Sequence, residues 1–373
     1  MTRPERGKLD ARGLRAAPSQ VLGAVRLVPL VRDEPLAGLH LYAAPTHADL
    51  TVVRLDPRTT YTAYVPHALV AALPGHGQAH ASAGTQLVRP RAAPEAVFRV
   101  QMTQRLARRE GDGLRLLPQH LALEAYLSVG FGGPDVAWPE YSREVLSRGL
   151  SPRVERVRRG DAVRGLDDAL RVFELYPGQV GVLVFVADAF ASAFVTPCPE
   201  DYRRLHRTLL EDMYGELLVQ YAVLHPDAAA LWGRIDGGAV GSLADLADAV
   251  AGLRREWGAF AGLMASGLLD AEFDVATAQH LGGFRLQRFL PSFNPHAENH
   301  VGEAIVDAAG RLAYLQTFRL SAAQARRGRL LSALVAADWE IAAAAEALGT
   351  SREELLARLR NNGLERLLKA HVR

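Results

Sequence analysis

The clearest structural signal in this chain of 373 residues is the stretch QVGVLVFVA at residues 179–187. A proline–glycine turn precedes it, and nearly all of its members are apolar, many of them β-branched or aromatic. A short, continuous run of this kind is typical of a strand that is buried on both faces. After a turn at residues 188–189, residues 190–195 predict a return strand. The stretch therefore predicts a buried β-hairpin, around which the rest of the chain must be arranged.

The hairpin is followed by a helix signal. The sequence TPCP at residues 196–199 ends the second strand, and Glu200 and Asp201 favour the positive end of a helix dipole. Apolar residues then recur at helical spacing as far as Tyr221, so the helix should pack on the sheet. The chain's one cysteine, Cys198, precedes this helix. Two interpretations stay open for it, a reactive thiol with a lowered pKa and a buried, inert thiol.

The remaining sequence divides into parts of different composition. Residues 1–20 are rich in charge, proline and glycine, and predict a flexible basic arm. Residues 21–222 predict a domain with a mixed β-sheet and packed helices. Residues 223–320 predict a helical zone and a small β segment with a hairpin, and residues 321–373 predict a three-helix, helix-turn-helix segment. The expected fold class is therefore α+β.

The composition excludes several classes of protein. Apolar residues make up 49% of the chain and charged residues 23%, which excludes a wholly disordered chain. The formal net charge is +2, which excludes a basic coat protein for nucleic acid. Of 43 basic residues only Lys8 and Lys369 are lysine, and the arginine fork suits phosphates and carboxylates. A single cysteine, no apolar run long enough to span a membrane and no secretory leader predict a cytoplasmic protein.

A regular apolar stripe runs through residues 243–264. Its members are spaced alternately three and four residues apart over three heptads, and Ser242 is a suitable N-cap for the helix. Two interpretations stay open, a core helix of a small bundle and the seam of a homodimer. The second requires the stripe to be exposed on the folded monomer.

The last fifty residues predict three short helices, near residues 326–337, 340–348 and 351–361. Ser351 and Glu354 form a capping box at the start of the third helix. An asparagine–glycine pair supplies the stop after it, and small alanines let two helices cross closely. This combination of a capped helix, a stop signal and small residues at a helix crossing is typical of a helix-turn-helix.

The string WEIAAAAEALGTSREELLARL at residues 339–359 resembles the Fis-type helix-turn-helix, and residues 362–364 close it as that family usually closes. The resemblance implies a recognition helix at residues 351–361 that lies in the major groove of DNA. The candidate DNA-binding residues are Ser351, Arg352, Arg358, Arg360, Asn361, Arg366 and Lys369.

Some residues of this segment argue against DNA binding. Glu353 and Glu354 begin the expected recognition helix, where carboxylates repel phosphates, and Leu356 and Ala357 replace residues that are usually polar or basic. The alternative is a helix-turn-helix-shaped bundle that packs against protein. The exposure of residues 351–361 distinguishes the two interpretations.

A second resemblance rests on residues 176–222. The proline–glycine turn, the buried strand, the return strand, the PEDY sequence and the long helix are similar to the ARG-and-rhodanese-phosphatase-superfamily-associated protein domain. A helix expected near Trp138 fits the same layout, so the resemblance extends over about residues 20–222. It implies an α+β fold and an association with ADP-ribose processing in prokaryotic conflict systems. It supplies no catalytic residues, and none are predicted.

The candidate metal site is the stretch HAENH at residues 296–300. His296, Glu298 and His300 alternate, so a strand would place all three on one side, where imidazole and carboxylate ligands suit a divalent metal. The preceding Asn294-Pro295 indicates a loop, in which such residues are common. A loop without a metal therefore stays open as the alternative, and no other cofactor is predicted.

Three functions follow from these signals. The first is a DNA-binding transcriptional regulator whose N-terminal domain senses a small-molecule ligand or a partner. The second is a nucleotide- or phosphometabolite-binding protein, or an enzyme, of an ADP-ribose-linked conflict system. The third is a scaffold that dimerises through residues 243–264.

Overall fold

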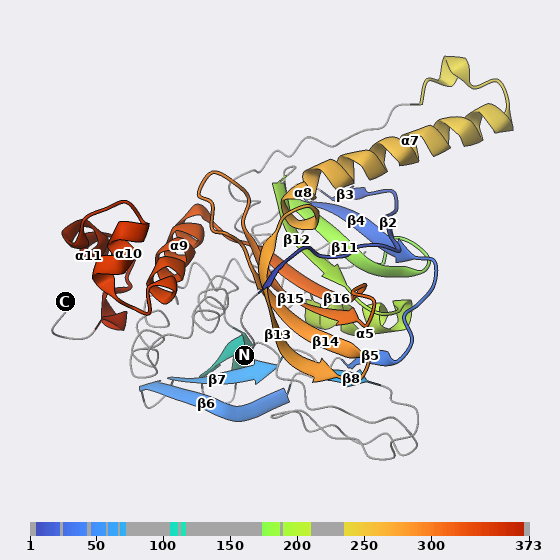
Figure 1. The fold of residues 1–373 in the computed structure, drawn as a ribbon. Coiled ribbons are helices and arrows are strands. Elements are labelled where there is room, and N and C mark those ends of the chain that lie inside the picture. The colour runs from blue at the N-terminus through green and yellow to red at the C-terminus, as the bar shows by residue number, and fades with distance from the viewer. Residues whose placement is uncertain are drawn as a thin grey trace.

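A ten-stranded antiparallel sheet forms the centre of the molecule in the computed structural model (Figure 1). The structure describes residues 5–22, 25–42, 46–56, 59–65, 68–71, 105–110, 113–116, 174–186, 189–209 and 235–368. The strands of the sheet are β1 (Glu5–Gly7), β2 (Leu14–Ala16), β3 (Gln20–Leu22), β4 (Val25–Arg32), β11 (Gln179–Val186), β12 (Ala189–Val195), β13 (Phe273–Leu281), β14 (Phe284–Leu290), β15 (His300–Asp307) and β16 (Leu312–Arg319). Their order is β1-β13-β14-β15-β16-β12-β11-β4-β2, and β3 also pairs with β4.

Two smaller sheets and several helices complete the described fold. The other strands are β5 (Leu39–Tyr42), β6 (Thr46–Asp56), β7 (Thr59–Val65), β8 (Ala68–Ala71), β9 (Arg105–Glu110) and β10 (Gly113–Leu116). β5 pairs with β8, and the other four pair in the order β10-β9-β7-β6. The helices are α5 (Pro199–Leu209), α7 (Leu243–Met264), α8 (Ser266–Leu269), α9 (Ala322–Ala336), α10 (Ile341–Ala347) and α11 (Arg352–Asn361), with short 3-10 turns η2 (Gly237–Ala239) and η3 (Glu365–Leu367).

β11 and β12 form the predicted hairpin, and every residue of β11 is buried. Successive side chains of a strand point to opposite faces, and here each face meets a separate core. Val182 and Val184 belong to a cluster shared with α5 and α9, whereas Leu183 and Phe185 belong to a cluster shared with α8. The prediction of a strand buried on both faces is confirmed, and so is the α+β fold class.

The structure corrects two boundaries that composition suggested. Residues 5–22 do not form the flexible arm predicted for residues 1–20, because β1 pairs with β13 and β2 and β3 pair with β4. The boundary expected near residue 222 does not divide the sheet, because β12 pairs with β16. The predicted small β segment is therefore the other half of one large sheet.

The helical predictions fare better. The helix expected from residue 199 is present as α5, and its expected continuation over residues 210–221 lies outside the described residues. The helix expected near Trp138 also lies outside them. The three C-terminal helices are present as α9, α10 and α11, grouped beside the sheet (Figure 1). Among the described helices, none combines the length and apolar character that crossing a membrane requires.

The two ends of the predicted apolar stripe on α7 lie in different environments. Near its C-terminal end, Ala261 is buried, Met264 packs against the core cluster that contains α8, and Phe260 contacts the guanidinium of Arg26. Near its N-terminal end, where α7 projects away from the sheet (Figure 1), Leu243 is 86% exposed and Leu246 is 40% exposed. The stripe is therefore a core element at one end and an exposed apolar surface at the other.

Candidate functional site

α11 presents most of its surface to solvent, which is the geometry that groove entry requires. Its buried residues are Leu355 and Leu359, which join the cluster that also holds Ile341 of α10. The predicted N-cap is confirmed, since Oγ of Ser351 accepts a hydrogen bond from the backbone N–H of Glu354 at 3.1 Å. Gly349 (φ +62°) makes the turn between the two helices, in a region that favours glycine.

The charged side chains on the outer face of α11 include two arginines that form ion pairs with glutamates. Nη2 of Arg358 donates to Oε1 of Glu354 at 2.6 Å, and Nε of Arg360 donates to Oε1 of Glu365 at 3.2 Å. A hydrogen bond from the Thr350 hydroxyl and the adjacent Arg358 lower the pKa of Glu354, so that it is ionised at neutral pH. The glutamates predicted to oppose phosphate binding are therefore charged, and one of them is neutralised by a neighbouring arginine.

The other candidate DNA-binding residues lie on this same face or beyond it. Arg352 and Asn361 are exposed at the two ends of α11. The side chain of Arg366 and the whole of Lys369 lie outside the described residues.

The structure does not bring the predicted metal ligands together. His296 and Glu298 lie in a loop before β15, and only His300 lies on the strand, so the alternation that would place all three on one side is absent. His296 is exposed, whereas His300 is fully buried. Among the described residues, these three do not form a group whose ligand atoms lie within 4.8 Å of one another. The loop alternative describes this stretch.

A chain of polar contacts forms there instead. Oε2 of Glu298 lies 3.6 Å from Nε2 of His300, and Oε1 of Glu298 lies 2.9 Å from Nη1 of Arg319. The His300 ring lies 4.9 Å from the Phe190 ring, and both of its nitrogens are buried without a hydrogen-bond partner in the described part of the chain. Burial lowers the pKa of His300, which outweighs the opposing effect of Glu298. His300 is therefore a neutral imidazole in the fold.

Burial also acts on Glu298, where it would raise the pKa of the carboxyl. The contact with His300 and the charge of Arg319 outweigh burial, so the pKa of Glu298 lies below its usual value. Glu298 is therefore a carboxylate at neutral pH, held between an imidazole and a guanidinium.

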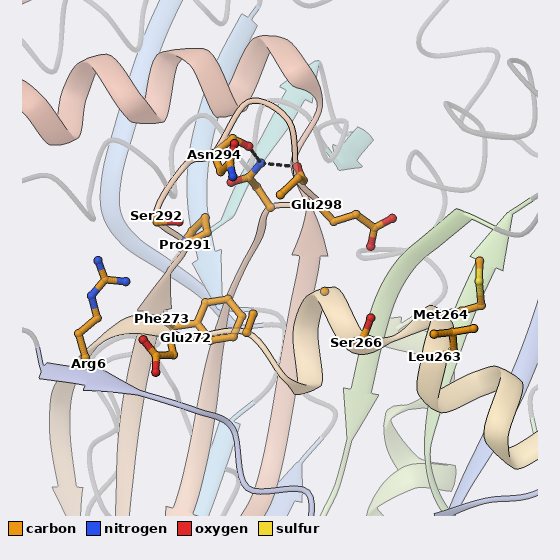
Figure 2. Close-up of a pocket in the computed structure, with 14 residues that line it drawn as sticks. Arg6, Leu263, Met264, Ser266, Glu272, Phe273, Pro291, Ser292, Asn294 and Glu298 are labelled. Atoms are coloured by element: carbon orange, nitrogen blue, oxygen red, sulfur yellow. Dashed lines mark hydrogen bonds between the residues drawn. The ribbon is translucent and has the colours of Figure 1, made fainter. Parts of the chain in front are cut away.

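Glu298 lines a pocket of about 540 Å³ between α8 and the loop before β15 (Figure 2). Gly267 of α8 permits this approach, because a Cβ at that position would lie 3.0 Å from Oε2 of Glu298. Nδ2 of Asn299 donates to the carbonyl oxygens of Asn294 at 2.7 Å and Ala297 at 2.8 Å, which fixes the loop. The pocket is thus a built feature of the fold.

The charges of this pocket do not favour a phosphorylated ligand. Two carboxylates, Glu272 and Glu298, line it together with the guanidinium of Arg6, which already contacts Asp274 at 3.2 Å. An anionic ligand would meet net negative charge there. The pocket therefore gives no support to the predicted nucleotide- or phosphometabolite-binding function.

A third group of polar side chains was not recognised in the sequence. His40 of β5 lies beside Cys198 and Asp201 at the N-terminal end of α5, and potential ligand atoms of the three lie within 4.8 Å of one another. Burial raises the pKa of the Cys198 thiol to about 11, which favours the inert interpretation of this cysteine over the reactive one. No local signal in the sequence joins these residues, because the two segments are about 160 positions apart.

Comparison with protein families identifies the larger part of the chain. The ARPP-2 family model matches residues 9–282. The chain belongs to the ARPP-2 family. The match confirms the resemblance carried by residues 176–222, and it extends through α7, α8 and β13. His40, Cys198 and Asp201 lie inside the matched region, whereas Glu298, His300 and α9–α11 lie beyond it. No curated protein and no solved structure matches the chain.

The neutral, buried state of His300 predicts a pH dependence of stability. Its pKa in the fold lies below the unfolded value of about 6.5, so the unfolded chain binds a proton that the fold excludes. Its contribution to stability is present above about pH 6.5 and falls as the pH drops, by at most about 1.4 kcal/mol per pH unit. Denaturant unfolding of H300Q between pH 6.5 and 5 should show a shallower loss of stability than the wild type.

The matched control for this prediction is H296Q, which removes an exposed histidine four residues away. H296Q should follow the wild-type dependence on pH. Equal slopes for H300Q and the wild type would show that His300 does not exclude a proton in the fold.

Proposed function

We propose that this protein binds DNA through α11 and acts as a transcriptional regulator, with the ARPP-2 region as its sensory or partner-binding part. The observation that carries the proposal is the exposure of the outer face of α11, from which Arg352 and Arg358 are accessible. A recognition helix packed against residues 227–320 would have to detach before entering a groove. The exposed geometry requires no such rearrangement.

The packing of α9–α11 supports this proposal. Ala344 and Ala345 are buried between α10 and its neighbours, where small side chains permit close helix crossing, and Leu355 of α11 fills the space beside them. Oγ of Ser321 accepts a hydrogen bond from the backbone N–H of Gln324, whose side chain accepts one in return from the Ser321 N–H, so α9 begins at a full capping box. The unit is anchored to the sheet at α9 and leaves α11 outermost.

Electrostatics make the expected binding moderate in strength. The exposed face of α11 carries three arginines and two glutamates, and two of the arginines are engaged in ion pairs. Exposed ion pairs are weak, so phosphates can compete for these arginines. Binding should therefore depend steeply on salt, because phosphate contacts release counterions.

Arg352 is the first residue to test, because it forms no ion pair with the described carboxylates and lies at the N-terminal end of α11. R352A should weaken binding to labelled genomic duplex fragments by about 1–3 kcal/mol and reduce the slope of log affinity against log salt by about one. Fluorescence anisotropy over a range of salt concentrations measures both quantities. The control is R285A, which removes an exposed arginine on β14. Binding that is undetectable in the wild type, or insensitive to salt, would exclude the proposed function.

Glu354 gives a test with the opposite sign. E354Q removes a carboxylate from the face of α11 and releases Arg358 from its ion pair. DNA affinity should therefore rise, and the salt slope should increase by about one. The matched control is E34Q, which changes an exposed glutamate between β4 and β5 and should leave both quantities unchanged. Unchanged or weaker binding by E354Q would show that DNA phosphates do not contact this face of α11.

We infer further that the DNA-binding form is a homodimer joined through the projecting half of α7. Leu243 and Leu246 expose a large apolar surface there. In an antiparallel pair of helices centred on Val250, Leu243 faces Trp257, Asp245 faces Arg255 and Leu246 faces Arg254, since each pair is equidistant from the centre. The first pair is apolar, the second joins opposite charges, and in the third the methylene stem of the arginine can cover the leucine.

The dimer has its own test. The double variant L243D/L246D should be a monomer by light scattering at concentrations where the wild type is a dimer, because it places carboxylates in the seam. The control L263D alters a leucine that is 72% exposed but lies outside the stripe, and it should dimerise normally. A monomeric wild type, or a dimeric double variant, would contradict pairing through α7.

A further inference from the structure

The N-terminal end of α5 and the turn before it are joined to β5 and to the segment before β5 by hydrogen bonds from the backbone. The N–H of Leu41 donates to Oδ2 of Asp201 at 3.1 Å, and the N–H of Leu36 donates to the carbonyl oxygen of Pro197 at 3.1 Å. These bonds fix β5 against the helix and place His40 beside the buried Asp201 carboxylate. The turn before the helix is fixed in the same way, since Oγ1 of Thr196 contacts the carbonyl oxygens of Val180 and Cys198.

Three different ligand types converge at this junction. Nδ1 of His40 lies 3.6 Å from Oδ1 of Asp201, and potential ligand atoms of His40, Cys198 and Asp201 all lie within 4.8 Å of one another. Tetrahedral zinc, with bonds of about 2.0–2.3 Å, places its ligand atoms about 3.3–3.8 Å apart. A small inward movement of the thiol and imidazole would therefore complete such a geometry.

The buried carboxylate of Asp201 is a second, independent observation at this junction. Its side chain is only 1% exposed, and Oδ1 is buried with no N–H or O–H group of the described residues donating to it. The thiol of Cys198, a weak donor, interacts with the carboxylate, and Nη1 of Arg204 lies 4.0 Å from Oδ1 on a side chain that is 57% exposed. A metal cation would supply Oδ1 with a partner, and the exposed Arg204 can turn outward as it binds.

We propose that His40, Cys198 and Asp201 bind a divalent ion of the zinc type. A thiolate and an imidazole select zinc or cobalt over calcium and magnesium, which prefer oxygen ligands. Three protein ligands leave a fourth position for water, the arrangement of an open zinc site. His40 is 40% exposed, so the ion can enter from solvent on that side.

Binding has a stated proton balance. The thiol holds its proton in the free protein, because burial raises its pKa to about 11, so the ion must displace that proton when the metal–sulfur bond forms. The proton leaves to solvent, and no electron is transferred. The site lies within the ARPP-2 region and apart from α11, so it stands whether or not the protein binds DNA.

Titration of the untagged, chelator-treated full-length protein with Co²⁺ tests the proposal. One equivalent should produce a near-ultraviolet thiolate-to-cobalt band and visible bands of a tetrahedral ion, and Zn²⁺ should abolish them by displacement. C198S should lose the thiolate band, and H40Q should weaken Co²⁺ binding at least about tenfold. The control H296Q, an exposed histidine elsewhere, should bind as the wild type does.

The result that overturns the site is equally specific. Absence of the thiolate band in the wild type, or its persistence in C198S, excludes cysteine ligation at this junction. H40Q is used in place of a variant of the buried Asp201, because the imidazole is partly exposed and its loss leaves the buried carboxylate in place. Equal Co²⁺ affinity in H40Q and the wild type excludes the three-ligand site.

Discussion

The burial of β11 on both faces is the constraint on which the rest of the structure depends. Each face of this strand belongs to a separate core, so two sets of elements must be supplied to cover one sheet. α5 and α9 cover one face, while α8 and the end of α7 cover the other. Burial of large apolar side chains such as Phe185 contributes about 1.5–3 kcal/mol each, which is why both layers are held to the sheet.

The sequence alone predicts the elements whose signals lie in neighbouring residues, and it does not predict those that depend on long-range strand pairing. The β11–β12 hairpin, the start of α5 and the N-cap at Ser351 are encoded by neighbouring residues, through apolar runs and capping side chains. The edge strands at residues 5–22 are not, because their short polar sequence becomes a strand only when β13 and β4 offer backbone hydrogen bonds. The boundary near residue 222 failed for the same reason, since the pairing of β12 with β16 is long-range.

The candidate sites show the same division between local and long-range information. The arginines of α11 were found because helical spacing and a turn residue place them on one exposed helix. The metal site predicted from the alternation of His296, Glu298 and His300 is wrong, because a loop does not keep the two-residue period of a strand. His40 and Asp201 were missed because only the contact of β5 with α5, a product of the whole fold, brings them together.

The proposed metal site and the proposed DNA-binding helix are connected by packing. Tyr202, which follows Asp201 in α5, belongs to the same buried cluster as Leu334 of α9 and Leu355 of α11. Continuous packing is necessary for one site to affect the other, but it is not sufficient. Coupling requires an element with two positions that each ligand favours differently. α5 is the element to examine, because its N-terminal end carries two of the metal ligands and its buried face carries Tyr202 into the core that supports α9–α11.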